Sequence, residues 1–168
     1  MYIQTPRLII TDLTPQMAEV LHRNSLDENT RRFLPDEVFE TPQEALDTIS
    51  FLIGRYGTAD GPFVHPVLTL EGQNIGYVEL VPKGDSFEIG YHIAEPFTGK
   101  GYASEAVTAF LPGICAQMGL TEVWGVCRAD NLASARVLEK CGFTKIFEGP
   151  ELYQGKIRPI KKYIWKTE

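Results

Sequence analysis

Residues 95–106 run Glu95-Pro96-Phe97-Thr98-Gly99-Lys100-Gly101-Tyr102-Ala103-Ser104-Glu105-Ala106. They follow an alternating apolar segment, Phe87 to Ile93, and open an amphipathic one, so we expect a turn from a strand into a helix. The first amides of a helix have no partner inside the helix and lie at the positive end of its dipole. Because two glycines leave the backbone accessible and a lysine lies between them, this turn predicts a phosphate-binding site.

Two common phosphate-binding loops do not fit this turn. A Walker A loop requires Gly-Lys-Ser/Thr after a first glycine and four residues, whereas Lys100 precedes Gly101 and Tyr102 follows it. A dinucleotide-binding loop requires a third glycine where Ser104 stands. The turn therefore belongs to another kind of anion site.

Composition limits the classes of protein to consider. The chain has 168 residues, 43% of them hydrophobic and 23% charged, which is typical of one globular domain over residues 1–168. The formal net charge is −6. Nucleic-acid-binding domains usually carry a basic surface, so we expect no nucleic-acid partner.

The termini and the cysteines give further expectations. Met1 to Arg7 has no basic start followed by an apolar run, and no apolar run approaches the roughly 20 residues of a membrane span. We therefore expect a cytoplasmic protein without membrane contact. Cys115, Cys127 and Cys141 are widely spaced within apolar patterns, which indicates reduced core thiols and neither a disulfide framework nor a metal site.

The first half of the chain predicts two helices and an antiparallel meander. Thr-Pro pairs mark two helix starts, and short turns separate alternating apolar runs. We expect polar loops over 25–36 and over 57–66. The predicted strands are Arg7 to Leu13, Val67 to Leu70, Ile75 to Val81 and Phe87 to Ile93, and the predicted helices begin at Thr14-Pro15 and Thr41-Pro42.

The second half predicts two more helices and three strands. One helix begins at Gly101, and Pro112-Gly113 would kink or interrupt it because proline removes an amide donor. A second helix begins with Asn131 as its N-cap and ends at Gly142. The predicted strands are Glu122 to Cys127, Phe143 to Glu148 and Arg158 to Trp165, with a break at Gly149-Pro150.

Two motifs resemble one family. The turn is similar to the acyl-CoA loop of the GNAT superfamily of N-acetyltransferases, Gln/Arg-x-x-Gly-x-Gly/Ala, with Thr98 as a departure at the first position. Residues 131–143 resemble the same superfamily's N-x-x-S-x-x-x-x-E-K-x-G-F signature. The opening Thr5-Pro6-Arg7-Leu8 is similar to the start of the RimJ/RimL branch, which includes ribosomal-protein N-terminal acetyltransferases.

This resemblance implies an α/β GNAT fold, with a mixed, mostly antiparallel sheet of six to seven strands flanked by helices. It implies acetyl transfer from acetyl-CoA to a primary amine, on a protein N-terminus or a small molecule, by direct attack in a ternary complex without metal. The protein would be a monomer or a homodimer. The residues expected to bind acetyl-CoA are Ile93, Ala94, Thr98, Gly99, Lys100, Gly101, Tyr102, Ala103, Asn131 and Ser134.

The resemblance assigns one catalytic role and leaves another open. Ser134 would donate a proton to the leaving thiolate. Strand alternation places Glu88, Gly90 and His92 on one face and Ile89, Tyr91 and Ile93 on the other. Glu88 and His92, with Glu79 on the preceding strand, are therefore candidates for the general base, directly or through a water.

Alternatives remain at this point. A GNAT fold that holds acyl-CoA without catalysis, as a sensor or a partner-docking module, is the competing class. The intact turn at 99–103 and the retention of Asn131 and Ser134 argue against it. Four aromatic residues between 33 and 56 would line an acceptor pocket or pack the helices together: Phe33, Phe39, Phe51 and Tyr56.

Overall fold

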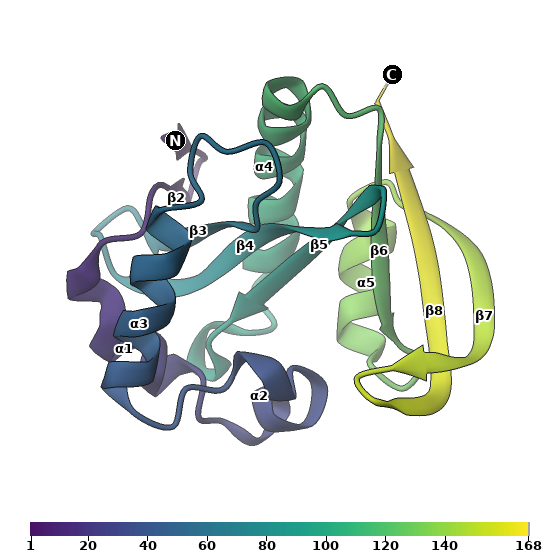
Figure 1. Ribbon diagram of the computed structural model, residues 1–168, viewed down its shortest axis with the longest axis horizontal. Coiled ribbons are helices and arrows are strands. Elements are labelled where there is room, and N and C mark those ends of the chain that lie inside the picture. The colour runs from purple at the N-terminus through teal and green to yellow at the C-terminus, as the bar shows by residue number, and fades with distance from the viewer. Residues whose placement is uncertain (168) are drawn as a thin grey trace.

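The structure is a computed structural model that describes residues 1–167. Its centre is one mixed sheet of eight strands in the order β1-β2-β3-β4-β5-β6-β8-β7 (Figure 1). All neighbouring strands are antiparallel except β5 and β6, which run parallel. The strands are β1 (Ile3–Gln4), β2 (Leu8–Ile10), β3 (Phe63–Thr69), β4 (Asn74–Lys83), β5 (Ser86–Ile93), β6 (Glu122–Arg128), β7 (Thr144–Tyr153) and β8 (Lys156–Lys166).

Helices pack on both faces of this sheet (Figure 1). Helices α1 and α3 contact one face, and α4 packs against the opposite face beneath β2, β4 and β5. Helix α5 packs against β6, and the short helix α2 lies below the ends of the central strands. The helices are α1 (Ala18–Asn24), α2 (Glu28–Phe33), α3 (Pro42–Ile53), α4 (Tyr102–Met118) and α5 (Leu132–Lys140), with short 3-10 turns at Pro15–Met17, Pro35–Glu37 and Glu95–Phe97.

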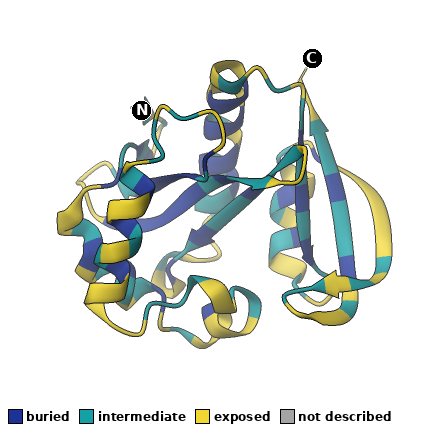
Figure 2. Ribbon diagram, in the orientation of Figure 1, coloured by how far each residue is buried: buried dark blue, intermediate teal, exposed yellow. Residues whose placement is uncertain are grey.

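The sheet divides the core into two hydrophobic layers, which Figure 2 shows as buried positions along the strands. Successive strand residues point to opposite faces, and β3 illustrates this. Its Phe63 and Val67 pack with Phe110 of α4, whereas Val64 packs with Ile49 of α3. Each fully buried side chain of this size stabilises the fold by roughly 1.5–3 kcal/mol.

Strands β5 and β6 separate soon after they meet. Their parallel pairing contains one register pair, Glu88 with Trp124, whereas β4 and β5 pair along their whole length. The strands then diverge toward Ile93 and Arg128, and the backbone groups of β5 on that side lose their strand partner. This split is where the candidate site lies.

The fold class expected from the sequence is confirmed, although the strand number is eight and not six to seven. The additional strand is β1, a two-residue pairing of Ile3 and Gln4 with β2. Within the polar stretch 25–36, the structure also contains α2, which was predicted as loop. Its N-terminus is capped by Asp27, whose side chain accepts a hydrogen bond from the amide of Thr30.

Pro112-Gly113 was predicted to kink or interrupt the helix; an interruption is wrong, because α4 is continuous from Tyr102 to Met118. Pro112 and Gly113 lie on the exposed side of the helix, where water can satisfy the carbonyl that loses its amide partner. The flanking Leu111 and Ile114 are buried against the sheet. Tertiary packing therefore holds the helix through the proline.

Several strand boundaries differ from prediction, and β2 covers only Leu8–Ile10 of the predicted Arg7 to Leu13. Strand β3 begins at Phe63, within the stretch predicted as loop, because Phe63 to Pro66 are buried and paired with β4. Strand β7 continues through Gly149-Pro150, where a break was predicted. It is the edge strand, so Pro150 has a free side on which no amide donor is required.

Cys115 and Cys127 are buried and Cys141 is partly buried, and none of the three forms a disulfide within residues 1–167. Over residues 1–167, no helix combines the length and the apolar character needed to cross a bilayer.

Candidate active site

The turn after β5 has the geometry of an anion site. Gly99 and Gly101 both adopt left-handed backbone angles, with φ of 76° and 80°, which glycine accepts without strain. The first helical hydrogen bond of α4 runs from the amide of Glu105 to the carbonyl of Gly101. The amides of 102–104 therefore have no partner within the helix, and no side chain caps them.

This turn borders a cavity of about 640 Å³ at the split between β5 and β6. The N-terminal residues of both α4 and α5 line this cavity. Most residues expected to bind acetyl-CoA line it, namely Ile93, Thr98, Gly99, Gly101, Tyr102, Ala103, Asn131 and Ser134. Ala94 and Lys100 do not line it. The elongated set of amides and apolar side chains suits a long ligand with a phosphate at one end.

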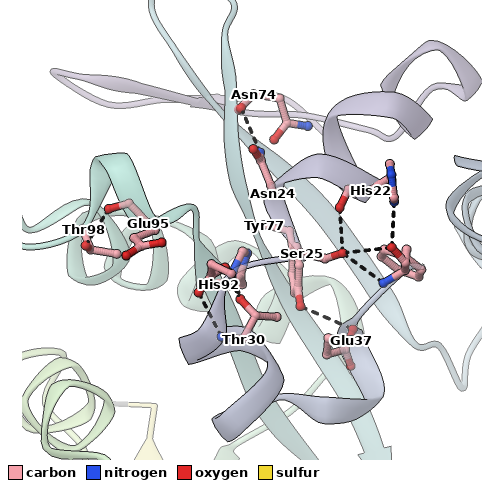
Figure 3. Close-up of polar contacts among 12 residues, drawn as sticks. His22, Asn24, Ser25, Thr30, Glu37, Asn74, Tyr77, His92, Glu95 and Thr98 are labelled. Atoms are coloured by element: carbon pink, nitrogen blue, oxygen red, sulfur yellow. Dashed lines mark hydrogen bonds and ion pairs between the residues drawn. The ribbon is translucent and has the colours of Figure 1, made fainter. Parts of the chain in front are cut away.

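Thr98 stands where the family pattern has Gln or Arg. Its hydroxyl donates to the carbonyl of Glu95 at 2.8 Å, as Figure 3 shows. The side chain therefore holds the 3-10 turn before the glycines. The backbone of the turn is left to make the phosphate contacts.

The amides of Ile93 and Ala94, at the end of β5, point in opposite directions. Ala94 N–H donates to the carbonyl of Ile75 in β4 at 2.8 Å, so it is not available to a ligand. Amides alternate in direction along a strand, and the amide of Ile93 therefore points toward the split. Of the two residues expected to hold a thioester carbonyl, the geometry favours Ile93.

A serine and a tyrosine meet across the split. The hydroxyl of Tyr91 in β5 lies 2.7 Å from Oγ of Ser134 and 3.0 Å from the carbonyl oxygen of Ser134. The Ser134 amide in turn donates to Oδ1 of the N-cap Asn131. Burial raises the pKa of the Tyr91 phenol far above its usual range, so both hydroxyls carry protons at neutral pH.

A second cavity, of about 420 Å³, lies next to the first and is lined by carboxylates. Strand register places Glu79 of β4 beside Gly90 of β5. A Cβ at Gly90 would lie 2.3 Å from Oε1 of Glu79, so only glycine leaves room for the carboxylate there. The acidic side chains that line this cavity are Asp36, Glu37, Glu79 and Glu88, with Lys83 as the basic one.

These carboxyl groups are harder to ionise than free ones. Burial raises the pKa of Glu79 to about 8, and the nearby charges of Glu37 and Glu88 add to the effect. Burial also raises the pKa of Glu37, against an opposing hydrogen bond from Tyr77, whose hydroxyl lies 3.3 Å from Oε2 of Glu37 (Figure 3). The pKa of Glu88 is raised by burial, with Lys83 opposing.

His92 is held by its neighbours. Its Nε2 lies 2.8 Å from the hydroxyl of Thr30 (Figure 3), and that hydroxyl lies 2.6 Å from Oδ1 of Asp27. Thr30 has one hydroxyl proton and donates it to the carboxylate, so Nε2 of His92 must be the donor to Thr30. Burial lowers the pKa of His92, which keeps the ring neutral. Nδ1 alone then retains a lone pair for proton transfer.

The two cavities share part of their wall, formed by Leu34, Tyr91 and Ser134. Glu79 and Glu88 lie in the carboxylate cavity, and His92 lies in the cavity beside the turn. Ser134 borders both. The structure thus brings together the expected loop, serine and carboxylates but separates His92 from the two glutamates.

Sequence reasoning missed several residues of the site. Tyr91 was assigned to a face but given no role, although a buried tyrosine usually has a hydroxyl partner. Glu37 and Gln154 were given no role, and nothing local indicates that they reach a cavity. Of the four aromatics left open, Phe33 lines the larger cavity, Phe39 and Tyr56 pack beside α1 and α3, and Phe51 is exposed.

Comparison with known proteins identifies this class of site. The family described as "Acetyltransferase (GNAT) domain" matches residues 7–144. The chain therefore belongs to the GNAT family of acetyltransferases, enzymes that use acetyl-CoA to acetylate amines. The superfamily expected from residues 98–103 and 131–143 is confirmed.

Individual relatives agree with this assignment. The chain is 30% identical over 147 residues to the uncharacterized N-acetyltransferase YoaA of Bacillus subtilis, a match that covers 85% of this chain and 82% of YoaA. Its fold is similar to that of a GNAT acetyltransferase from Bacillus anthracis, with TM-score 0.85, 23% identity and coverage of 99% and 98%. A RimL ribosomal L7/L12 alpha-N-protein acetyltransferase in complex with coenzyme A gives TM-score 0.85 at 18% identity, with the same coverage. The similarity to these two structures shows the fold.

Proposed function

We propose that this enzyme transfers the acetyl group of acetyl-CoA to a primary amine by direct attack, with acetyl-CoA in the cavity beside the turn and the amine in the carboxylate cavity. The observation that supports this most directly is the wall that the two cavities share at Tyr91 and Ser134. Two substrates that enter from opposite sides of the split meet there. Such positioning can contribute several kcal/mol to catalysis.

The free amides of α4 and the turn suit the diphosphate of acetyl-CoA. A side chain at Gly101 would project toward Nη2 of Arg7 and Nζ of Lys140, 3.5 and 3.8 Å from its Cβ. The turn therefore has both bare backbone and nearby positive charge. The Ile93 amide would hold the thioester carbonyl and stabilise the oxyanion that forms there.

The hydroxyl pair would supply the proton that the leaving thiolate needs. Oγ of Ser134 would donate directly to the thiolate. The Tyr91 hydroxyl can then replace the proton that Ser134 has given up, through their 2.7 Å contact. We assign the donation to Ser134 with Tyr91 behind it. This is the family role of the serine, extended by one hydrogen bond.

Glu79 is the base that the geometry favours. A primary ammonium has a pKa of about 10.4, so proton transfer to an ordinary carboxylate is uphill by about six pKa units. Each unit corresponds to about 1.4 kcal/mol of free energy. With the Glu79 pKa at about 8, the gap falls to between about two and three units. Glu88 is the second candidate. His92 is less suited because it lines the cavity beside the turn and not the carboxylate cavity, where we propose that the amine binds.

The carboxylates also bear on the choice of amine. An acceptor with a second cationic group would pair with Glu37 or Glu88 while its reacting amine lies near Glu79. We therefore propose cationic acceptors, whether a small polyamine-like molecule or a protein N-terminus followed by basic residues.

A thiol-release assay with acetyl-CoA tests the function. The acceptors are an alkyl monoamine, a diamine of equal length, and short peptides with a free α-amino group and either basic or acidic second residues. We expect amine-dependent release of CoA, with a lower KM for the diamine or the basic peptide. Calorimetric binding of acetyl-CoA without turnover for any amine would instead support the non-catalytic acyl-CoA-binding module, and absence of binding would refute the loop assignment.

A further inference from the structure

Arg7, one residue before β2, reaches across to the turn that precedes α4. Its Nη1 donates to the carbonyl of Lys100 at 2.9 Å. Its Nε donates to Oε2 of Glu105 at 2.6 Å, and Nη2 lies 2.6 Å from the same oxygen. Its guanidinium carbon lies 4.6 Å from the ring centre of Tyr102. One side chain thus contacts the residues before and after Gly101 as well as the first turn of the helix.

The segment that carries Arg7 is itself held by Glu105. The Thr5 hydroxyl donates to Oε1 of Glu105 at 2.6 Å, and the backbone amide of Arg7 donates to the same oxygen at 3.1 Å. Thr5 also accepts a hydrogen bond from the amide of Leu8, which closes the turn around Pro6. This accounts for Thr5-Pro6-Arg7-Leu8, a motif that the reaction itself leaves unexplained.

The two charged side chains largely neutralise each other. Burial acts against ionisation of Glu105, but hydrogen bonds from Thr5 and Arg7 outweigh it and lower the pKa of this carboxyl. An ionised Glu105 that shares Oε2 with Arg7 offsets most of the positive charge that Arg7 brings to the anion site. Geometry and not net charge is then what Arg7 supplies.

We infer that Arg7 is a positioning residue for acetyl-CoA: with Glu105 it clamps Lys100 to Tyr102 so that the amides around Gly101 are held ready for the diphosphate. Without the clamp, the two left-handed glycines on either side of Lys100 make the turn free to adopt many conformations, and binding must then order it. The inference rests on the proposed acetyl-CoA site. It adds a role for residues about a hundred positions away in the sequence.

Two variants separate the clamp from a direct phosphate contact. Arg7→Lys keeps the charge but loses the planar fork that binds a carboxylate and a carbonyl together. Glu105→Gln removes the clamp but leaves Arg7 as an uncompensated cation. If the clamp matters, both variants should raise the Kd of acetyl-CoA by about tenfold, the equivalent of about 1.4 kcal/mol. At saturating acetyl-CoA, kcat should change by less than about twofold.

The chain offers a matched control pair at Arg55 and Asp60. Arg55 also donates through Nε to a carbonyl, that of Gly61 at 2.7 Å, and pairs with a carboxylate, that of Asp60 at 2.7 Å. Neither residue lines the described cavities. Arg55→Lys and Asp60→Asn should lower the melting temperature to a similar degree and leave the Kd of acetyl-CoA unchanged.

Several outcomes would overturn the inference. Tighter binding by Glu105→Gln would make Arg7 a direct phosphate ligand. If Arg7→Lys lowers the melting temperature but leaves the Kd of acetyl-CoA unchanged, the contacts of Arg7 stabilise the fold and do not support cofactor binding. Failure of the unmodified protein to bind acetyl-CoA would refute the proposed function and the inference together, whereas normal binding with unaffected variants would refute the inference alone.

Discussion

The hydroxyl of Tyr91 lies 2.7 Å from Oγ of Ser134 and thereby joins β5 to α5 across the split in the sheet. When Tyr91 donates to Oγ of Ser134, the proton of Ser134 is free to pass to another acceptor, so the pair can form a short proton relay. Its position between the two cavities makes it the point at which the proposed reaction would occur.

Removal of either hydroxyl should slow turnover more than it weakens cofactor binding. We expect Ser134→Ala and Tyr91→Phe each to lower kcat by about 10- to 100-fold, as for loss of a general acid. The KM for acetyl-CoA should change by less than about threefold. Steady-state kinetics measures both. The kcat of the double variant should be only slightly lower than that of the slower single variant, because the two residues act as a unit.

Ser50→Ala is a suitable control, since the Ser50 hydroxyl on α3 also donates to a carbonyl but lies outside the cavities. Equal losses in kcat and in acetyl-CoA affinity for Ser134→Ala would identify a binding role for Ser134 in place of proton donation.

Glu79 should set the pH dependence of the reaction. Its carboxylate must be deprotonated to accept a proton, so kcat/KM should rise with pH up to about 8. Glu79→Gln should lower the rate by about 100-fold and remove this limb. Any pH dependence that remains should follow the pKa of the amine itself, which a series of amines of different basicity reveals. If Glu79→Gln keeps the rise of kcat/KM with pH and Glu88→Gln loses it, Glu88 is the base.

The same carboxyl should make stability depend on pH. Its pKa is higher in the folded protein than the usual value of 4.5, so from about pH 4.5 to about 8 the folded state holds a proton that the unfolded chain has released. The free energy of unfolding should therefore fall as pH rises through this window. Urea titrations at pH 5, 6.5 and 8 give the free energy of unfolding, and its decrease with pH should be smaller for Glu79→Gln than for the unmodified protein. An equal decrease with pH in both proteins would contradict the raised pKa.

Gly90 should matter because it makes room for Glu79. A methyl group at this position would lie 2.3 Å from Oε1 and force the carboxylate aside. We expect Gly90→Ala to reduce kcat/KM about as strongly as Glu79→Gln, by about 100-fold, while the Kd of acetyl-CoA stays unchanged. Addition of Gly90→Ala to the Glu79→Gln variant should lower kcat/KM little further. If the double variant instead loses the product of the two single fold-changes, Gly90 acts independently of Glu79.

A carboxylate at Gly101 should abolish cofactor binding. The left-handed backbone costs a non-glycine residue roughly 1–2 kcal/mol, and the new side chain would point toward Arg7 and Lys140. We expect the Kd of acetyl-CoA to rise by about 100-fold or more for Gly101→Glu, measured by calorimetry. Gly72→Glu is the control, because Gly72 has φ of 88° with open space around it. Comparable binding by both variants would place the phosphates elsewhere.

The sequence predicted best those features that depend on neighbours in the chain. The anion turn rests on Gly99 and Gly101 and the start of α4, and Asn131 caps α5 as expected. Local patterns failed where the environment overrides propensity. Pro112 is tolerated because its side of α4 faces solvent, and Pro150 because β7 is an edge strand. The short helix α2 has too few residues for a periodic pattern.

The sequence alone therefore predicted the family, the fold class and the left-handed glycine turn before α4, because capping, glycine backbone angles and strand alternation act over a few residues. Only the tertiary structure brought Glu79 over Gly90, joined Tyr91 to Ser134 and linked Arg7 to Glu105, which are 98 positions apart. These contacts depend on strand register and on the separation of β5 from β6. Such long-range geometry follows from the packing of the whole sheet, which no short stretch of sequence encodes.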